Sequence, residues 1–488
     1  MSRAARIGGS RMTSPLLLGI DEGTTAVKAA LFDVDLRVVR EATRRVPTVH
    51  PRPGWVERDP VAVLDAVVDA VAELLRDAPG DVVACGLDHE GESVLAWDAE
   101  TGEPLSPIVV WSDKRSEEVL ARLGADEDEI RRRSGLPLDP YFSAGKLAWL
   151  LEHGIEDRPG LRLGNVDAFL TERLGAGFAT DPSTVSRTML GVARWDPWLC
   201  ERFGVPVERL PAVGDSVGEL GALRHPAWPA EVPLRARVVD QQAALAGAGC
   251  VEPGRVKATY GTGVFVLAHT GAERIEPRGA LLPTVAWGID GRVEYALDGG
   301  VFTAGALLEW LSGELGLASD PAALAALAAT VPDSGGVRVL PALSGLGAPW
   351  WRPGARAVVA GMTAGTRPAH VARAALEAIA WRVADIAAVV DGEVGLDVLR
   401  VDGGLTRDAL LLELQADAAG VPVERGLVDA TVAGVAALAA VGAGLWSSTR
   451  EIAERLPRGE RVEPRRDDAW RAAEHAAWRA FVERAAEL

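Results

Sequence analysis

Short apolar runs broken by polar turns open the chain. Two of them, Leu16–Ile20 and Ala26–Phe32, flank the sequence DEGTT at residues 21–25. Apolar runs of this length, bounded by glycine and acidic residues, predict strands joined by a turn. The opening therefore predicts strand, turn, strand, with an acid, a glycine and two threonines in the turn.

A helix and a further strand follow. In Val61–Leu75 apolar residues recur every three or four positions, and Asp59 and Pro60 precede it as an N-cap and a first helical residue. The sequence DVVACGLDHEGES then predicts a buried strand that runs into a polar loop at Asp88–Ser93. Open α/β sheets bind ligands at the carboxyl ends of their strands, so this loop is a candidate site.

The second half of the chain repeats this plan. After a glycine-rich stretch at residues 243–253, residues 254–270 again read strand, Gly/Thr turn, strand, and residues 399–420 read strand, Asp-Gly-Gly, amphipathic helix. We therefore expect a duplicated α/β fold with a cleft between two lobes. The predicted divisions are a disordered tail at 1–14, a first lobe at 15–247 and a second lobe at 248–488.

Composition limits the classes of function. A chain of 488 residues is too long for one hydrophobic core. Its net charge of −18 argues against nucleic-acid and membrane partners, which need basic faces. Three widely spaced cysteines suit a reducing compartment, and no apolar run is long enough to span a membrane. These features predict a cytoplasmic protein.

Three glycine-containing turns are candidate phosphate sites: Gly23–Thr25, Gly261–Gly263 and Gly403–Gly404. Backbone amides in such turns offer hydrogen-bond donors with little steric bulk. Ordinary hairpin turns are the alternative for each one. Asp21, at a strand end, suits Mg²⁺, which keeps several waters and takes few carboxylates; a turn-initiating aspartate is the alternative there.

Asp240 lies between an apolar strand and a helical stretch in the sequence VVDQQAAL. A carboxylate at this position could accept the proton of a substrate hydroxyl during phosphoryl transfer. It could equally serve as a helix N-cap. The local sequence leaves both readings open. Neither GxGxxG opening a helix, GxxxxGK[ST] nor HExxH occurs.

Taken together, these stretches resemble the FGGY carbohydrate kinase family, most closely its glycerol-phosphorylating members. The matching sequences include DEGTTAVK, IVVWSDKR, DPYFSAGKLAWL, SRTML, DQQAALAG, TYGTGVF, LSGLGAPWW and RVDGG, in order from about residue 16 to 446. The resemblance implies two actin-like (ribonuclease H-like) ATPase lobes. It also implies ATP and Mg²⁺ as cofactors, with the first lobe on the substrate side and the second on the nucleotide side.

The resemblance assigns roles residue by residue. It implies Asp240 as the catalytic base, and Asp21 with Asp240 as the residues associated with magnesium. The implied substrate-binding residues are Glu92, Trp111, Tyr141, Asp240, Gln241 and Phe265. The implied nucleotide-binding residues are Thr24, Thr25, Lys28, Gly261, Thr262, Gly263, Gly305, Glu309, Gly404 and Asp408.

Some positions depart from the family pattern. Gly91 stands where the glycerol-phosphorylating members carry an arginine, a loss that we expect to leave room and to alter selectivity. Val239 replaces a glycine, and Glu309 and Asp408 replace glutamine and asparagine at nucleotide-lining positions. The chain also lacks the basic glycine-rich loop linked to sugar-bisphosphate inhibition, so we expect no such regulation.

The expected function is ATP-dependent phosphorylation of a terminal hydroxyl of a small polyol or sugar, with glycerol first. A tetritol, a pentitol or a ketopentose such as xylulose is the alternative acceptor. A sugar sensor with weak catalysis and an actin-like ATP-binding protein are the remote alternatives. The expected partner is a small molecule, and the resemblance allows a homodimer or a homotetramer.

Overall fold

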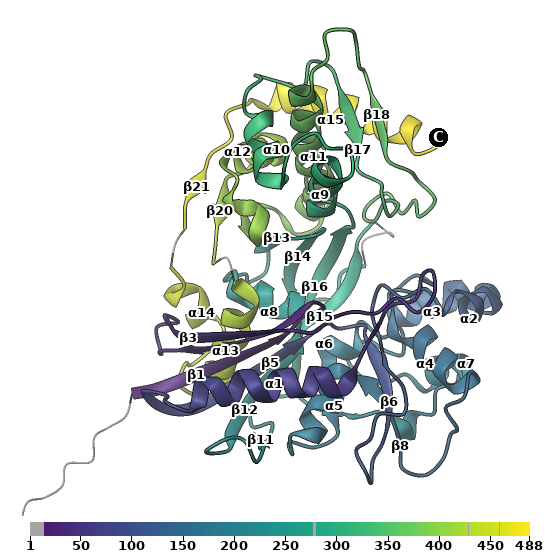
Figure 1. Cartoon of the computed structure of the whole chain (residues 1–488), viewed down its shortest axis with the longest axis vertical. Helices are drawn as coiled ribbons and strands as arrows, with labels where there is room; N and C mark the ends of the chain where they lie inside the picture. The colour runs from purple at the N-terminus through teal and green to yellow at the C-terminus, as the bar shows by residue number, and fades with distance from the viewer. Residues whose placement is uncertain (1–13, 277–279, 428, 458) are drawn as a thin grey trace, which may run out of the picture.

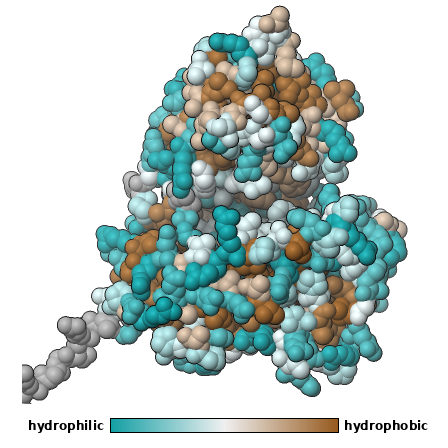
Figure 2. Space-filling view, viewed as in Figure 1, coloured by the Kyte–Doolittle hydropathy of each residue, from teal (hydrophilic) through white to brown (hydrophobic). Residues whose placement is uncertain are grey.

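The structure is a computed structural model that describes residues 14–276, 280–427, 429–457 and 459–488. Two lobes lie one above the other along the longest axis (Figure 1), and the surface narrows between them (Figure 2). The predicted tail lies outside the described residues except for Ser14, which begins the first strand. None of the described helices is long and apolar enough to cross a membrane.

The first lobe is built on a six-stranded sheet with the order β11-β12-β5-β1-β2-β3. The neighbours β12, β5 and β1 are parallel, whereas β1, β2 and β3 are joined antiparallel. The strands are β1 (Ser14–Glu22), β2 (Ala26–Phe32), β3 (Val38–Arg45), β5 (Gly80–His89), β11 (Ala222–Leu223) and β12 (Val232–Val239).

The second lobe has a seven-stranded sheet with the order β15-β16-β14-β13-β19-β20-β21. Its strands are β13 (Val256–Tyr260), β14 (Val264–Gly271), β15 (Leu282–Ile289), β16 (Arg292–Val301), β19 (Leu399–Asp402), β20 (Val423–Arg425) and β21 (Arg461–Val462). Five of them, β16-β14-β13-β19-β20, repeat the pairing of β3-β2-β1-β5-β12, antiparallel twice and then parallel twice. The duplicated α/β fold expected from the sequence is confirmed.

Helices cover the sheets as the apolar patterns predict. Helix α1 (Pro60–Leu75) packs on β2 and β3, and the Asp59 carboxylate caps it by accepting a hydrogen bond from the amide of Val61 at 2.9 Å. The long helix α11 (Pro368–Val394) packs on α12 (Ala409–Ala419) and β14 in the second lobe. The apolar spacing at residues 61–75 and the amphipathic pattern within residues 399–420 thus located α1 and α12 correctly.

A helix from late in the chain packs on the sheet of the first lobe. Helix α13 (Ala430–Gly442) lies against β1, β5, β12 and α8 (Asp240–Gly247). The approach is close, since a Cβ at Gly19 would lie 2.3 Å from the carbonyl oxygen of Val432, and one at Gly86 would lie 2.2 Å from that of Val435. The two parts of the chain therefore share a core. The division after residue 247 stays a prediction.

A smaller sheet and several short elements carry the loops of the candidate site. The smaller sheet has the order β4-β7-β6-β8. Its strands are β4 (Glu57–Arg58), β7 (Ile108–Val109), β6 (Val94–Asp98) and β8 (Leu161–Asn165). The remaining elements are α2 (Glu117–Arg122), α3 (Glu127–Ser134), α4 (Ser143–Glu152), α5 (Val166–Arg173), β9 (Ala179–Thr180), α6 (Pro182–Val185), α7 (Pro197–Phe203), β10 (Ala212–Val213), α9 (Gly305–Gly313), α10 (Pro321–Ala328), β17 (Arg338–Leu340), β18 (Val358–Ala360), α14 (Arg450–Arg455) and α15 (Asp468–Ala485).

Candidate active site

Three aspartates meet at the carboxyl ends of parallel strands in the first lobe. Asp21 on β1 pairs in register with Asp88 on β5, and Asp240 begins α8 directly after β12. The sequence singled out Asp21 and Asp240. It did not single out Asp88, which reads as the first residue of a polar loop. The only signal for Asp88 in the sequence was its position at the end of a predicted strand.

Nearby lysines offset the negative charge of this buried cluster only in part. Burial raises the pKa of Asp21 to about 6, and burial with the charge of Asp21 raises the pKa of Asp88 well above its usual range. Both carboxylate oxygens of Asp88 are fully buried and accept no hydrogen bond from the described residues. A cation would relieve this excess of negative charge.

The oxygens of this cluster fit Mg²⁺. No group of three metal-binding side chains was found among the described residues. Magnesium nevertheless needs only one or two carboxylates, because it keeps most of its waters and takes the rest of its ligands from phosphate. Asp21, Asp88 and Asp240 are therefore suited to hold the ion through water.

Asp240 has the properties of a general base. Burial, followed by the negative charges of Glu92 and Asp21, raises the pKa of its carboxyl to about 7. One oxygen accepts a hydrogen bond from the amide of Gln241 at 2.6 Å. The carboxylate makes no bond to the amides one turn into α8, so the N-cap alternative does not describe it. A carboxyl that titrates near neutral pH is matched to proton transfer.

Lys257 supports Asp240 and Gln241 from the second lobe. Its ammonium on β13 donates to the side-chain oxygen of Gln241 at 2.7 Å and to the hydroxyl of Thr259 at 2.8 Å. Its positive charge lowers the pKa of Asp240 against the effect of burial. Lys257 lies in no pattern that predicts a role for it, although lysine is scarce in this chain.

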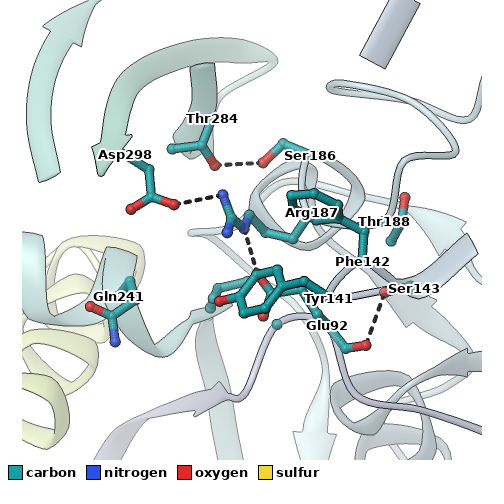
Figure 3. A network of polar contacts seen from close by, with 12 residues as sticks. Glu92, Tyr141, Phe142, Ser143, Ser186, Arg187, Thr188, Gln241, Thr284 and Asp298 are labelled. Atoms are coloured by element: carbon teal, nitrogen blue, oxygen red, sulfur yellow. Dashed lines mark hydrogen bonds and ion pairs between the residues drawn. The ribbon is translucent and has the colours of Figure 1, made fainter. Parts of the chain in front are cut away.

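A second cluster brings Glu92 and Tyr141 together with two residues that the sequence did not single out (Figure 3). The Nε of Arg187 lies 2.6 Å from Glu92 Oε1, and its Nη1 lies 2.9 Å from Asp298 Oδ2. The guanidinium carbon lies 5.7 Å from the centre of the Tyr141 ring. Arg187 follows α6 in the first lobe and Asp298 lies on β16, so this ion pair joins the two lobes. Arg187 lies within the stretch SRTML, and Asp298 begins an Asp-Gly-Gly sequence like the one at residues 402–404.

Trp111 and Thr24 are linked directly. The indole nitrogen of Trp111 donates to the Thr24 hydroxyl at 3.0 Å, and that hydroxyl donates to Glu90 at 2.6 Å. Arg58 holds the same Glu90 at 2.7 Å. The Trp111 ring meets the Tyr141 ring edge to face, with centroids 5.5 Å apart. The hydroxyl of Thr24 is therefore engaged at the wall of the pocket, which leaves the backbone amides of the turn and the Thr25 hydroxyl for a phosphate.

The expectation that Gly91 leaves room in the pocket is wrong. A Cβ at this position would lie 2.7 Å from Val239 Cγ1 and 3.4 Å from Arg187 Cγ. The larger side chain at position 239 and the stem of Arg187 occupy the space. The loop itself is held by the side chain of Asn165, whose Nδ2 donates a hydrogen bond to the carbonyl oxygen of Gly91 at 2.8 Å. The space directly beside Gly91 is thus occupied.

The turns of both lobes present free amides. The amides of Thr24, Thr25, Thr262 and Gly263 make no backbone hydrogen bond within the described residues. In the second lobe the turn is held from behind, because the amide of Gly305 donates to the carbonyl oxygen of Gly261 at 3.1 Å. A Cβ at Gly305 would lie only 2.6 Å from that oxygen. Glycine at position 305 therefore sets the place of the Gly261–Gly263 turn.

The remaining predicted residues lie around these turns. Gly404 is exposed and follows β19, with no atom within 4 Å of a Cβ built on it. Glu309 is exposed on α9, while Asp408 caps α12 through one carboxylate oxygen and keeps the other without a partner in the described chain. Lys28 pairs with Asp429 at 2.7 Å and with Glu41 at 3.4 Å, so a phosphate contact would compete with these carboxylates.

Phe265 lies on the same face of the second sheet as Asp298. On β14 and β16, Phe265 pairs with Gly300 and Leu267 pairs with Asp298, which makes Phe265 and Asp298 diagonal neighbours. The Phe265 ring is 3.4 Å from a Cβ built at Gly300. Phe265 therefore stands beside the ion pair that Asp298 forms with Arg187.

Two sheets of matching topology, with acids and glycine turns at their strand ends, define a two-lobed phosphotransferase of the actin-like class. The chain belongs to the FGGY family of carbohydrate kinases, whose N-terminal domain matches residues 16–247 and whose C-terminal domain matches residues 256–443.

Known proteins resemble the chain over nearly its full length. It is 43% identical to a glycerol kinase of Gloeobacter violaceus over 97% of both chains, and 40% identical to one of Stenotrophomonas maltophilia over 96% of this chain and 98% of that protein. Among solved structures, a Plasmodium falciparum glycerol kinase with ADP aligns with a TM-score of 0.90 at 30% identity, covering 97% of this chain and 98% of that one.

Proposed function

We propose that the chain transfers the terminal phosphoryl group of ATP to a terminal hydroxyl of glycerol. The observation that carries the proposal is Asp240, a carboxylate with a pKa near 7 that stands between the acidic cluster at Asp21 and the pocket at Glu92. The similarity to glycerol kinases over the whole chain supports the same activity.

The pocket favours a small acceptor. Val239 and Arg187 fill the space beside Gly91, and the rings of Trp111 and Tyr141 stand edge to face at the wall. Glu92 and Arg187 supply charged acceptors and donors, which suit hydroxyl groups. This arrangement supports glycerol over tetritols, pentitols and ketopentoses.

In the proposed mechanism Asp240 accepts the proton of the attacking hydroxyl, and Gln241, held by Lys257, orients the acceptor beside it. The amides of the turns at Gly23–Thr25 and Gly261–Gly263 hydrogen-bond to phosphate oxygens. Mg²⁺ held at Asp21, Asp88 and Asp240 would supply positive charge that offsets the phosphate oxygens.

The test is release of ADP across a panel of acceptors at fixed ATP and Mg²⁺. The panel holds glycerol, erythritol, threitol, xylitol, ribitol, arabitol, xylulose and ribulose. We expect the highest kcat/KM with glycerol. A four- or five-carbon acceptor that exceeds glycerol tenfold, a difference of about 1.4 kcal/mol, would assign a different substrate. If no acceptor stimulates ADP release, the alternative of a sugar sensor with weak catalysis is favoured.

A further inference from the structure

The guanidinium of Arg187 is held at two of its three nitrogens and is free at the third. Nε contacts Glu92 and Nη1 contacts Asp298, with both side chains less than a tenth exposed. Nη2 has neither a hydrogen bond nor an ion pair within the described residues, and it is open to solvent. One nitrogen of a fixed cation is therefore available to a ligand.

Each of the two carboxylates that hold Arg187 has a second oxygen without a partner in the described chain. Glu92 employs Oε1 with Arg187, while its Oε2 has no partner in the described chain. Asp298 employs Oδ2, and its Oδ1 is fully buried without a hydrogen bond from any described residue. Glu92 Oε2 is not closed off from solvent, so a ligand hydroxyl can donate a hydrogen bond to it. A hydroxyl can both donate and accept a hydrogen bond, and Glu92 and Arg187, which are in direct contact, offer an acceptor and a donor.

The direction of Arg187 is fixed by packing. Its guanidinium carbon lies 5.7 Å from the Tyr141 ring centre and 5.5 Å from that of Phe142, within the range of a cation–π contact. Its Cγ passes beside Gly91, where a side chain would press on it. Figure 3 shows the guanidinium lying between Asp298 and the Glu92–Tyr141 side of the pocket.

We propose that Arg187 is a specificity-determining residue that donates from Nη2 to a non-reacting hydroxyl of the polyol, while Glu92 and Asp298 hold the guanidinium in place. This inference rests on the proposed function and names the group that recognises the acceptor. Since Asp298 belongs to the second lobe, residues of both lobes position the guanidinium that binds the acceptor.

The test compares glycerol with propane-1,2-diol and propane-1,3-diol, each of which lacks one hydroxyl. In the wild type, kcat/KM for glycerol should exceed that for at least one diol. The ratio of kcat/KM for glycerol to kcat/KM for that diol should fall by about 10–100-fold in Arg187→Met. Loss of a hydrogen bond to a charged group affects only the substrate that makes this bond.

Arg382→Met is the matched control. Arg382 is equally buried and paired, with Asp385 at 3.1 Å, but it lies in α11 of the second lobe and contacts none of the pocket residues. The control should leave the ratio unchanged even where it lowers overall activity. Binding of ADP to Arg187→Met, measured by calorimetry, should match that of the wild type.

Arg187→Lys guards against failure to fold, because it keeps a positive charge between Glu92 and Asp298. A single ammonium cannot reproduce three nitrogens in a plane, so its ratio should also fall. A wild-type ratio in either variant, or equal losses on glycerol and both diols, overturns the inference and leaves the proposed function standing. A wild type that phosphorylates no polyol refutes the proposed function and this inference together.

Discussion

The pH dependence of kcat/KM follows from the environment of Asp240. As a general base, this residue works only when its carboxyl has lost its proton. With a pKa of about 7, about a tenth of the molecules hold the active form at pH 6 and about nine tenths at pH 8. The kcat/KM for glycerol should therefore rise about tenfold between these two values. An ordinary aspartate would give no change in this range.

The midpoint of this rise of kcat/KM with pH, the acid limb of the profile, should respond to charges near Asp240. Lys257 lowers the pKa of this carboxyl, so Lys257→Met should move the midpoint to higher pH, by about one unit at most. Glu92 raises the pKa of Asp240, so Glu92→Gln should move the midpoint to lower pH. This variant should also bind the polyol less tightly. Opposite shifts from two single substitutions identify the titrating group.

The assay is the initial rate of ADP formation from pH 5.5 to pH 9, with glycerol below its KM and MgATP saturating. Asp240→Asn is the control, because any limb that it retains comes from the nucleotide or from another residue. A wild-type profile that is flat between pH 6 and pH 8, or a limb that survives in Asp240→Asn, would refute the reasoning.

Three further predictions concern stability and the glycine positions. Asp88→Asn removes a buried carboxyl that lies against Asp21 and whose ionised form burial disfavours, so thermal unfolding at pH 8 should show a gain of about 1–3 kcal/mol together with a loss of activity. The gain should shrink as pH falls, because the raised pKa means that Asp88 takes up its proton in the folded state first; an equal gain at pH 5 would argue against this cause. Gly91→Ala should cost about 1–3 kcal/mol in urea unfolding through its clash with Val239, and Val239→Ala in the same chain should recover part of the loss, whereas additive losses would count against the clash. Gly305→Ala should raise the KM for ATP by displacing the Gly261–Gly263 turn, while Gly313→Ala in the same helix, where a Cβ meets nothing within 4 Å, should not; equal effects of the two would mean that helix stability and not the turn is responsible.

Local features of the fold were readable from the sequence. The strand at Ala26–Phe32 and the helix that begins after Asp59 follow from apolar spacing and from one capping side chain, both of which are local. The repeated strand–turn–strand pattern predicted the duplicated sheets. The place of α13 on the first lobe could not be predicted, because it depends on close approach of backbones at Gly19 and Gly86, far away in the chain.

The candidate site was predictable only in part for the same reason. Asp21 and Asp240 stand at strand ends that the local pattern reveals. Asp88 becomes notable only when β5 is placed beside β1, which sets the two carboxyls in register. Arg187 and Asp298 meet across the two lobes, and neither has a local signal of ion pairing. The filled space at Gly91 depends likewise on Val239, which lies on a neighbouring strand.

The most direct test of the account is a single-turnover measurement of phosphoryl transfer from MgATP to glycerol in Asp240→Asn beside the wild type. Calorimetry on both proteins would verify that the nucleotide still binds. We predict that the rate of glycerol phosphorylation falls by about 10²–10⁴-fold in Asp240→Asn, with little change in nucleotide affinity. A rate within twofold of the wild type would contradict the assignment of Asp240 as the base and with it the proposed mechanism.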